Sequence, residues 1–253
     1  MLQYFFKNNI SNLSHHKIFM IKKLVFSFAF LFTLSFANAQ NMHAAFNKML
    51  NTHVSSDGKV KYAGFKKDKH ILDAYINMLA TTKVSDKWSK PEKLSFWINT
   101  YNALTIRTIV EHYPIKSIKD IDGGEPWKVK RFTNGGKSFS LNDIENTILR
   151  PMGDARIHFA INCAAASCPP LANKAFDAEN VEALLEKRTN HFINDAYFNM
   201  ISHDRAKISK IFDWYKSDFP NLDAFLTKYN AQHTVVDAKT AISYFDYDWK
   251  LNE

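Results

Sequence analysis

The sequence predicts the α+β fold class, as a single domain in which a central buried helix packs on a small, mostly antiparallel sheet. Three observations predict this class. Serine capping boxes open two helical stretches, residues 156–162 alternate between apolar and polar side chains as a half-buried strand does, and glycine or polar turns separate other short strand-like runs. Helices combined with strands that mostly do not alternate with them are typical of α+β domains.

The first 39 residues are predicted to be an N-terminal extension and a cleavable secretory signal peptide. Met20 makes a natural start for that signal, so residues 1–19 are left out of the fold. The three parts of the signal are the basic pair Lys22-Lys23, the apolar run 24–36 and the small-residue cleavage site Ala37-Asn38-Ala39. The apolar run is shorter than the roughly 20 residues that span a bilayer. We therefore expect export to the periplasm or the extracellular space, with no membrane span after cleavage.

Residues 40–253 are predicted to form one globular domain, because no low-complexity linker or internal repeat divides them. Removal of residues 1–39 takes away four lysines and no acid, so the formal charge falls from +8 to +4. The remaining basic residues are interspersed with acids rather than gathered in a stripe, which argues against a nucleic-acid partner. We expect no cofactor.

The first elements of the domain are expected to be scaffold. Amphipathic spacing predicts short helices over residues 41–51 and 71–80. Between them, Ser56-Asp57-Gly58 is typical of a turn and residues 59–62 are typical of a strand.

The clearest helix begins at the capping box Ser89-Lys90-Pro91-Glu92 and is expected to end before Pro114. Its body is apolar nearly all round, which is typical of a buried helix. Asn99 and Asn102 nevertheless share one stripe of it with Ser95. Because buried amides need hydrogen-bond partners, these two either tie loop backbone to the helix or line a site.

A change of period follows this helix. Glycines 123, 124, 135 and 136 predict a loop or hairpin around residues 127–132. The second capping box, Ser140-Leu141-Asn142-Asp143, opens a helix that carries Glu145 and ends near Gly153. Residues 156–162 then predict a strand with Arg156, His158 and Asn162 on one face.

The last third is predicted to contain one long helix and several short elements. Amphipathic spacing predicts a helix over residues 181–192. The remaining expected elements are a hairpin of residues 197–202 and 207–211 turned at His203-Asp204-Arg205, short aromatic helices near 212–218 and 222–229, and a closing strand over 242–251.

Several motifs occur in an order that indicates a known family. They are Phe96-Trp97-Ile98-Asn99-Thr100-Tyr101-Asn102-Ala103, Arg156-Ile157-His158-Phe159-Ala160, Asn162-Cys163 with Ser167-Cys168-Pro169-Pro170-Leu171, Ile211-Phe212-Asp213-Trp214-Tyr215 with Asp218-Phe219, and Tyr247-Asp248-Trp249. With these motifs the chain resembles the domain of unknown function 547 (DUF547) family over about residues 90–252. The resemblance implies no particular activity. It implies a histidine where this chain has Asn146, so an acid–base role is not expected at that position.

The two cysteines, Cys163 and Cys168, leave four interpretations open. In an oxidising compartment they predict a disulfide, which stabilises by roughly 2 kcal/mol when it closes so small a loop. Alternatively one of them is a nucleophile whose pKa is lowered by His158, with an imidazole oriented by Asn99, Asn102 or Glu145. The other two interpretations are a zinc site formed with His158 and a reduced, inert pair of thiols.

The sequence thus predicts a polar pocket in which His158 lies within hydrogen-bond reach of Asn99, Asn102, Glu145 or a cysteine. The candidate site residues are His158, Cys163, Cys168, Asn99, Asn102, Glu145 and Arg156. We expect a thiol-type hydrolase or acyl-transfer enzyme. The alternative is a non-catalytic module, stapled by a Cys163–Cys168 disulfide, that binds a peptide, glycan, small molecule or envelope component. The aromatic residues Trp97, Tyr101, Trp214 and Trp249 are expected in the core, with sugar stacking as the other role for one of them.

Overall fold

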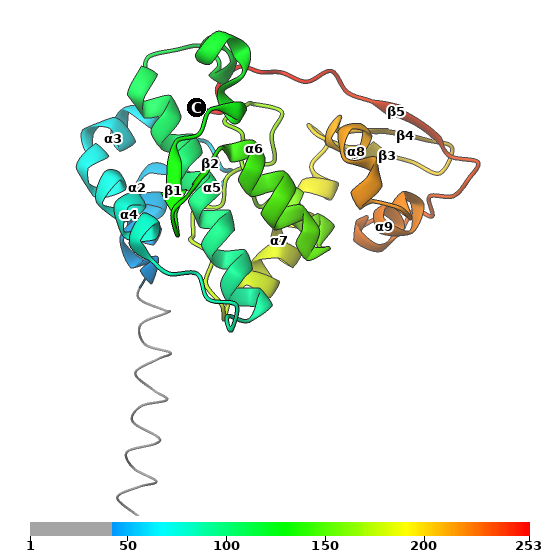
Figure 1. Cartoon of the computed structure of the whole chain (residues 1–253). Helices are drawn as coiled ribbons and strands as arrows, with labels where there is room; N and C mark the ends of the chain where they lie inside the picture. Colours follow the sequence, from blue (N-terminus) through cyan, green and yellow to red (C-terminus); the bar gives the residue numbers. More distant parts are fainter. Residues whose placement is uncertain (1–41) are drawn as a thin grey trace, which may run out of the picture. The chain divides into compact units, whose positions relative to one another are not determined.

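Three short helices begin the part of the chain that the computed structural model describes, residues 42–253. The predicted signal peptide lies outside these residues. The helices are α2 (Ala44–His53), α3 (Tyr62–Lys67) and α4 (Lys69–Thr81), and they lie together around one side of α5 (Lys90–His112) (Figure 1). The strand predicted at 59–62 is reduced to a single bridge between Val54 and Val60, and Tyr62 already begins α3.

Helix α5 begins where the sequence predicts. The Ser89 hydroxyl accepts a hydrogen bond from Glu92 N at 3.4 Å, and the Glu92 carboxylate accepts one from Ser89 N at 2.7 Å, so the capping box is complete. Residues from Leu94 to Val110 are buried with one exception, Arg107. Burial on all sides explains why this helix shows no clear polar face.

Helices pack against α5, and its Trp97 side chain contacts a strand pair. Trp97 packs edge-on against Phe132 and Phe139, which belong to the antiparallel hairpin of β1 (Phe132–Asn134) and β2 (Lys137–Phe139). Beyond this contact, the packing of the central helix on a small sheet stays a prediction. The hairpin itself turns at Gly135 and Gly136, which both have positive φ.

The second capping box also forms, and the segment that it opens is unusual. Helix α6 (Leu141–Asp143) continues directly into the π-helix η4 (Ile144–Leu149) and the 3-10 turn η5 (Arg150–Met152), and ends at Gly153 in the left-handed conformation. Single π-helical turns recur at functional sites. Here the wide turn carries Glu145, whose side chain is buried.

The strand predicted over residues 156–162 is wrong. Residues Ala155–Phe159 form the 3-10 helix η6, which begins where Asp154 Oδ1 accepts a hydrogen bond from Arg156 N at 3.0 Å. A side-chain cap of this kind offers the backbone a local alternative to strand pairing. Because Ile157, His158 and Phe159 are all buried, the apolar–polar alternation does not mark two opposite faces.

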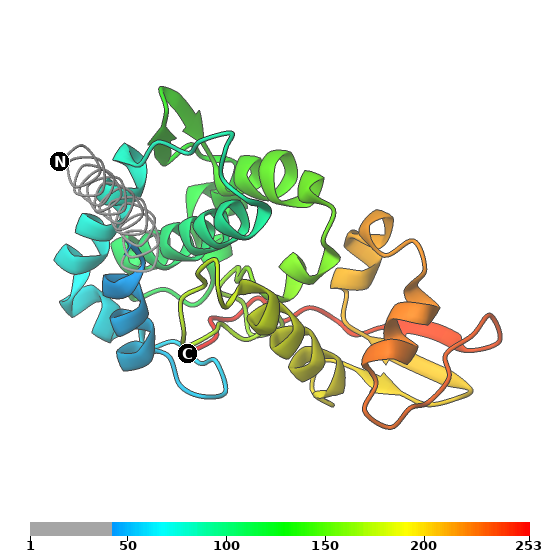
Figure 2. The same cartoon turned by 90° about the horizontal axis from the view of Figure 1, so that it is seen from below.

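The C-terminal third surrounds a second group of aromatic side chains. Helix α7 (Val181–Asn194), α8 (Ile211–Trp214), η7 (Lys216–Asp218) and α9 (Leu222–Tyr229) enclose a core that includes Phe159, Phe192 and Phe212. Strand β3 (Met200–Ile201) pairs antiparallel with β4 (Arg205–Ile208), as the hairpin prediction expects. Strand β5 (Ala241–Tyr244) joins β4 in parallel, so most strand pairs are antiparallel (Figure 2).

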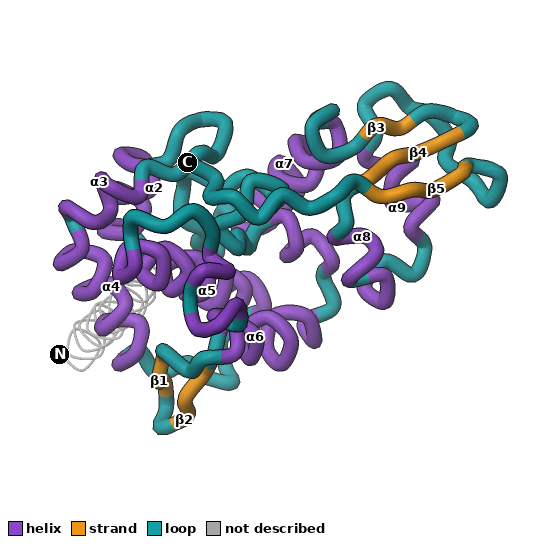
Figure 3. Tube along the Cα trace, turned by 90° about the horizontal axis from the view of Figure 1, so that it is seen from above, coloured by secondary structure: helices purple, strands orange, loops and turns teal. Residues whose placement is uncertain are grey.

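The chain beyond β5 leaves the sheet. Residues 245–253, which we call the C-terminal strap, run back along the loop that carries Cys163 and Cys168, the cysteine loop. They end beside the helices at the N-terminal end of the domain (Figure 3). Isolated bridges of Ser117 with Lys250 and of Ala165 with Leu251 hold this strap in place. The strand predicted over 242–251 is thus limited to β5, and the residues after it pair with the rest of the domain through these isolated bridges.

Residues His43–Glu253 form one compact unit, and its helices and small sheets confirm the α+β class. Three further 3-10 turns, η1 (Ile118–Asp120), η2 (Asp122–Gly124) and η3 (Pro126–Lys128), lead from α5 to β1. Within residues 42–253, no helix has the length and apolar character that crossing a membrane would require.

Candidate functional site

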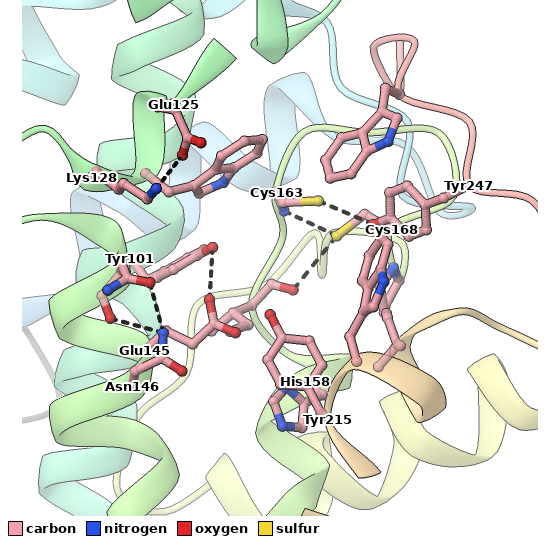
Figure 4. A pocket seen from close by; sticks show the side chains of 17 residues that line it. Tyr101, Glu125, Lys128, Glu145, Asn146, His158, Cys163, Cys168, Tyr215 and Tyr247 are labelled. Carbon is pink, nitrogen blue, oxygen red and sulfur yellow. Dashed lines mark hydrogen bonds and ion pairs between the residues drawn. The ribbon is translucent and has the colours of Figure 1, made fainter.

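A cavity of about 350 Å³ lies where several segments meet. They are α5 with Tyr101, the η3 region with Trp127, the π-helical segment with Glu145, the cysteine loop that follows η6, the α8 region with Tyr215, and the C-terminal strap with Tyr247. Four of the residues predicted from the sequence line this cavity together: Glu145, His158, Cys163 and Cys168. Figure 4 shows Tyr101 and Glu145 on one side of it and the two cysteines with Tyr247 across from them.

The two cysteines are free thiols that lie against each other. Cys163 N donates a hydrogen bond to Cys168 Sγ at 3.0 Å, and Cys163 Sγ lies 3.2 Å from the Tyr247 hydroxyl. Cys168 is buried, whereas Cys163 is partly exposed. Both cysteines line the cavity, and Cys163 is the more exposed residue of the two.

The loop that carries the cysteines is held by an asparagine that sequence analysis placed only on a strand face. Asn162 Oδ1 accepts from Ala164 N at 2.9 Å, and its Nδ2 donates to Pro169 O at 2.9 Å. Ala164 has a φ of 66°, a conformation that costs a non-glycine residue about 1 kcal/mol or more. The Asn162 side chain thus ties the two ends of a strained loop around the sulfurs.

The pKa values of the two thiols are shifted in opposite directions. Hydrogen bonds from Cys168, and to a smaller extent from Tyr247, lower the pKa of the Cys163 thiol below its ordinary value despite burial of the site. Burial raises the pKa of the Cys168 thiol well above its ordinary value. In this pair Cys163 is therefore the nucleophile-like member and Cys168 the hydrogen-bond donor.

Glu145 places a carboxyl group in the same cavity. Its Oε2 accepts a hydrogen bond from the Tyr101 hydroxyl at 3.3 Å. Burial raises the pKa of this carboxyl, and hydrogen bonds from Tyr215 and Tyr101 oppose the rise only in part. Glu145 therefore keeps its proton to higher pH than an exposed glutamate does.

His158 lines the cavity, but its hydrogen-bond partner is Asp218. Its Nε2 lies 2.8 Å from Asp218 Oδ2, and its ring packs on Tyr215 with centroids 4.0 Å apart. Burial lowers the pKa of His158 to about 4, an effect that Asp218 offsets only in part. A neutral imidazole supplies no positive charge to stabilise a thiolate. The predicted role of His158 in lowering a cysteine pKa therefore has no electrostatic basis in this structure.

His158 instead belongs to a clamp around Tyr215. Arg150 forms a two-pronged ion pair with Asp218, with N–O distances of 2.7 Å, and its guanidinium lies 5.3 Å from the Tyr215 ring centre. These ion-pair hydrogen bonds hold the pKa of Asp218 well below its ordinary value. The Tyr215 hydroxyl, fixed in this way, hydrogen-bonds to Glu145. Sequence analysis missed Arg150, Asp218 and Tyr215 as a site, because they become neighbours only through folding.

The other candidates lie outside the cavity. Asn99 exchanges hydrogen bonds with the backbone of Phe176, donating at 2.7 Å and accepting at 3.1 Å. Asn102 donates to Ala160 O at 2.9 Å and accepts from Asn162 N at 2.8 Å. Both amides thus hold loop backbone against α5, one of the two roles that the sequence left open.

Arg156 also lies away from the cavity. Its guanidinium pairs with Asp154 and Glu182, both at 2.7 Å, and with Glu186 at 3.3 Å. The predicted sharing of one face by Arg156 and His158 is wrong, because the 3-10 turn rotates neighbouring side chains in different directions from those of a strand. Among residues 42–253, no group of three His, Cys, Asp or Glu side chains is arranged to hold a metal.

Four aromatic side chains form one wall of the cavity, and we call them the aromatic wall: Trp127, Trp214, Tyr247 and Trp249. Their ring centroids lie 4.6–5.9 Å from one another in contacting pairs. Trp214 is 46 % exposed, so the expectation that it lies in the core is wrong. Trp97 and Tyr101, in contrast, are buried.

This fold and site define an α+β domain with a cysteine–glutamate pocket. Residues 85–193 match the model of the family described as a protein of unknown function, DUF547, which confirms the resemblance stated from the motifs. The match covers α5, Glu145 and both cysteines, whereas the motifs around Tyr215 and Tyr247 lie beyond it. No curated protein and no solved structure matches the chain.

Proposed function

We propose that the protein is a cysteine-dependent hydrolase or acyl-transfer enzyme, with Cys163 as nucleophile and Glu145 as the proton-carrying group. One observation supports this most. Cys163, the more exposed cysteine and the one with a lowered pKa, lines the same cavity as Glu145, whose carboxyl has a raised pKa. Two groups whose pKa values are pushed apart in this way are suited to nucleophilic and acid–base roles respectively.

The first half-reaction forms an acyl-enzyme. Cys163 loses its proton to solvent, and its thiolate attacks the carbonyl carbon of an ester or amide. The bond between that carbon and the leaving oxygen or nitrogen then breaks, and the leaving group takes the Glu145 proton. The products are a thioester on Cys163, a neutral leaving group and a Glu145 carboxylate.

The second half-reaction restores the enzyme. Water, or an amine or alcohol acceptor, attacks the thioester while the Glu145 carboxylate takes one of its protons. The carbon–sulfur bond breaks, Cys163 leaves as thiolate, and the acyl group departs as acid, amide or ester. Tyr101 and Tyr215 keep Glu145 oriented through both steps, and His158, Arg150 and Asp218 act as positioning residues through Tyr215.

A non-catalytic binding module is the second candidate. It is supported by the closeness of the cysteines, since the 3.0 Å hydrogen bond from Cys163 N to Cys168 Sγ brings the two side chains together. Oxidation to a disulfide would then staple the loop and remove the nucleophile.

Alkylation with iodoacetamide, followed by intact mass measurement, distinguishes the two candidates. For the enzyme we expect one fast-reacting thiol, retained in Cys168→Ser and lost in Cys163→Ser. We also expect burst release of p-nitrophenol from p-nitrophenyl acetate that disappears in Cys163→Ser. A protein isolated 2 Da lighter, without reactive thiol and without burst, would favour the binding module.

We also infer that the domain is exported after removal of residues 1–39. The basic pair Lys22-Lys23, the apolar run and the Ala37-Asn38-Ala39 site support this. N-terminal sequencing of the protein from its native host is expected to begin at Gln40. A chain that keeps its N-terminus and remains in the cytoplasm would contradict export.

A further inference from the structure

The aromatic wall contributes to the cavity three tryptophans that the proposed chemistry does not use, besides Tyr247, which contacts Cys163. Its members come from three distant parts of the chain: Trp127 from η3, Trp214 from α8, and Tyr247 and Trp249 from the C-terminal strap. Three of the five tryptophans of the protein thus line one cavity. Trp214 is exposed and Trp127 and Trp249 are partly exposed, so they leave water-accessible apolar area, which is costly unless a ligand covers it.

The lining of the wall suits two classes of ligand poorly. Lys119 Nζ already lies 5.1 Å from the Trp249 ring centre, so a cationic ligand would meet a like charge on that ring. Aliphatic lining is restricted to Ile161, Ile211 and Pro169, a small surface for an alkyl chain. Flat rings of this kind instead favour a ligand with a flat, neutral, partly apolar face.

Polar side chains line the cavity together with the rings. Asn142 and Asn146 are hydrogen-bonded to each other at 2.9 Å, and Lys128 pairs with Glu125 at 3.1 Å. Figure 4 shows Glu125 and Lys128 together at one side of the cavity, with Asn146 beside Glu145. A pyranose ring matches both kinds of lining, because its C–H face packs on an aromatic ring while its hydroxyls hydrogen-bond at the edge.

We infer that the aromatic wall is a subsite for a sugar ring, and that the substrate class is a glycan bearing an ester- or amide-linked acyl group. The sugar packs on Trp214 and its neighbours, and the acyl carbonyl reaches Cys163 in the same cavity. The acyl part of this inference rests on the proposed function, whereas the sugar subsite is independent of it.

Binding is measured on the full chain carrying Cys163→Ser, so that no probe is turned over. The probes are three free saccharides: N,N′,N″-triacetylchitotriose, cellotriose and xylotriose. Tryptophan fluorescence reports occupancy and calorimetry gives the affinity. We expect saturable binding of at least one probe, weakened roughly tenfold by Trp214→Ala, which corresponds to about 1.4 kcal/mol. Trp88→Phe, away from the cavity, is the matched control and should bind unchanged.

The outcomes separate the sugar subsite from the enzyme. Absence of saturable binding for all three saccharides, or equal affinity in Trp214→Ala, overturns the subsite. Saccharide binding without thiol-dependent turnover of ester substrates by the unmutated protein sinks the proposed chemistry and leaves the subsite standing. Thiol-dependent turnover without saccharide binding overturns the sugar subsite and leaves the proposed chemistry standing. Circular dichroism confirms that the Trp214→Ala variant is folded.

Discussion

The hydroxyl of Tyr247 lies 3.2 Å from the sulfur of Cys163, although 84 residues separate the two in the chain. This contact means that the C-terminal strap completes the site around a nucleophile that the cysteine loop provides. Bridges of Lys250 with Ser117 and of Leu251 with Ala165 hold the strap against the segment after α5 and against that loop. We therefore expect docking of the strap to affect the reactivity of the thiol.

Substitution Tyr247→Phe removes one of the hydrogen bonds that lower the pKa of Cys163. We expect the pH midpoint of iodoacetamide alkylation at Cys163 to move upward, with little change in the free energy of unfolding. The measurement is the alkylation rate between pH 5 and 10, read by intact mass. Tyr244→Phe, on strand β5, is the control. A midpoint that stays in place would show that the hydroxyl does not stabilise the thiolate.

Substitution Glu145→Gln separates nucleophile activation from proton transfer. Where Glu145 has lost its proton, its carboxylate raises the pKa of Cys163 through charge repulsion, so the neutral Gln should lower the alkylation midpoint and speed alkylation above the pH at which Glu145 titrates. Loss of the proton carrier should at the same time slow ester turnover by roughly 10²–10⁴-fold. Opposite effects on alkylation and turnover are the expected result. A parallel loss of both would indicate a collapsed site rather than a missing acid.

Stability should fall as the pH is lowered from 6.5 towards 4. Burial lowers the pKa of His43 and of His158 from 6.5 to about 4. Within that window the unfolded chain binds more protons at these positions than the folded protein does, so unfolding becomes easier as the pH falls. Each histidine accounts for on the order of 3 kcal/mol over the whole window. Glu145 acts in the opposite sense, because its pKa is raised.

Urea unfolding at pH 7, 5.5 and 4.5 checks this prediction. The free energy of unfolding should drop steadily, and His43→Gln, which leaves the cavity intact, should flatten part of the slope. An unchanged free energy between pH 7 and 4.5 would mean that the two imidazoles are not buried in the neutral form.

Gly58 should resist substitution, because its backbone has a φ of +83° and an added Cβ would lie 2.4 Å from Pro170 Cβ. We expect Gly58→Ala to lower the free energy of unfolding by about 2–4 kcal/mol, from left-handed strain plus overpacking. Displacement of Pro170 should also alter alkylation of Cys163 on the same loop.

Gly123→Ala is the matched control for this test. Gly123 has a φ of +64°, and an added Cβ would meet nothing within 4 Å. It should cost only the backbone strain, about 1 kcal/mol. Equal losses in the two variants, measured by urea unfolding, would show that contact with Pro170 is unimportant.

Local sequence signals predicted the elements whose causes are local. The capping boxes at Ser89 and Ser140 lie at the observed helix starts, and the glycine pair at 135 and 136 lies at the observed hairpin turn. The error over residues 156–162 has a physical reason. A short alternating run forms a strand only if a neighbouring strand pairs with it. Here the Asp154 side chain caps a 3-10 helix instead.

The sequence by itself determined the α+β class, the resemblance to the DUF547 family that the match over residues 85–193 confirms, and the two cysteines and one glutamate that line the cavity. Only the tertiary structure decided which groups act on them. Tyr247, Tyr215, Asp218 and Arg150 reach the site from separate segments, and the pKa of each titrating group depends on burial and on those neighbours. Burial and distance between remote segments are properties of the folded chain, so no local pattern could reveal that His158 supports Tyr215 instead of pairing with a thiolate.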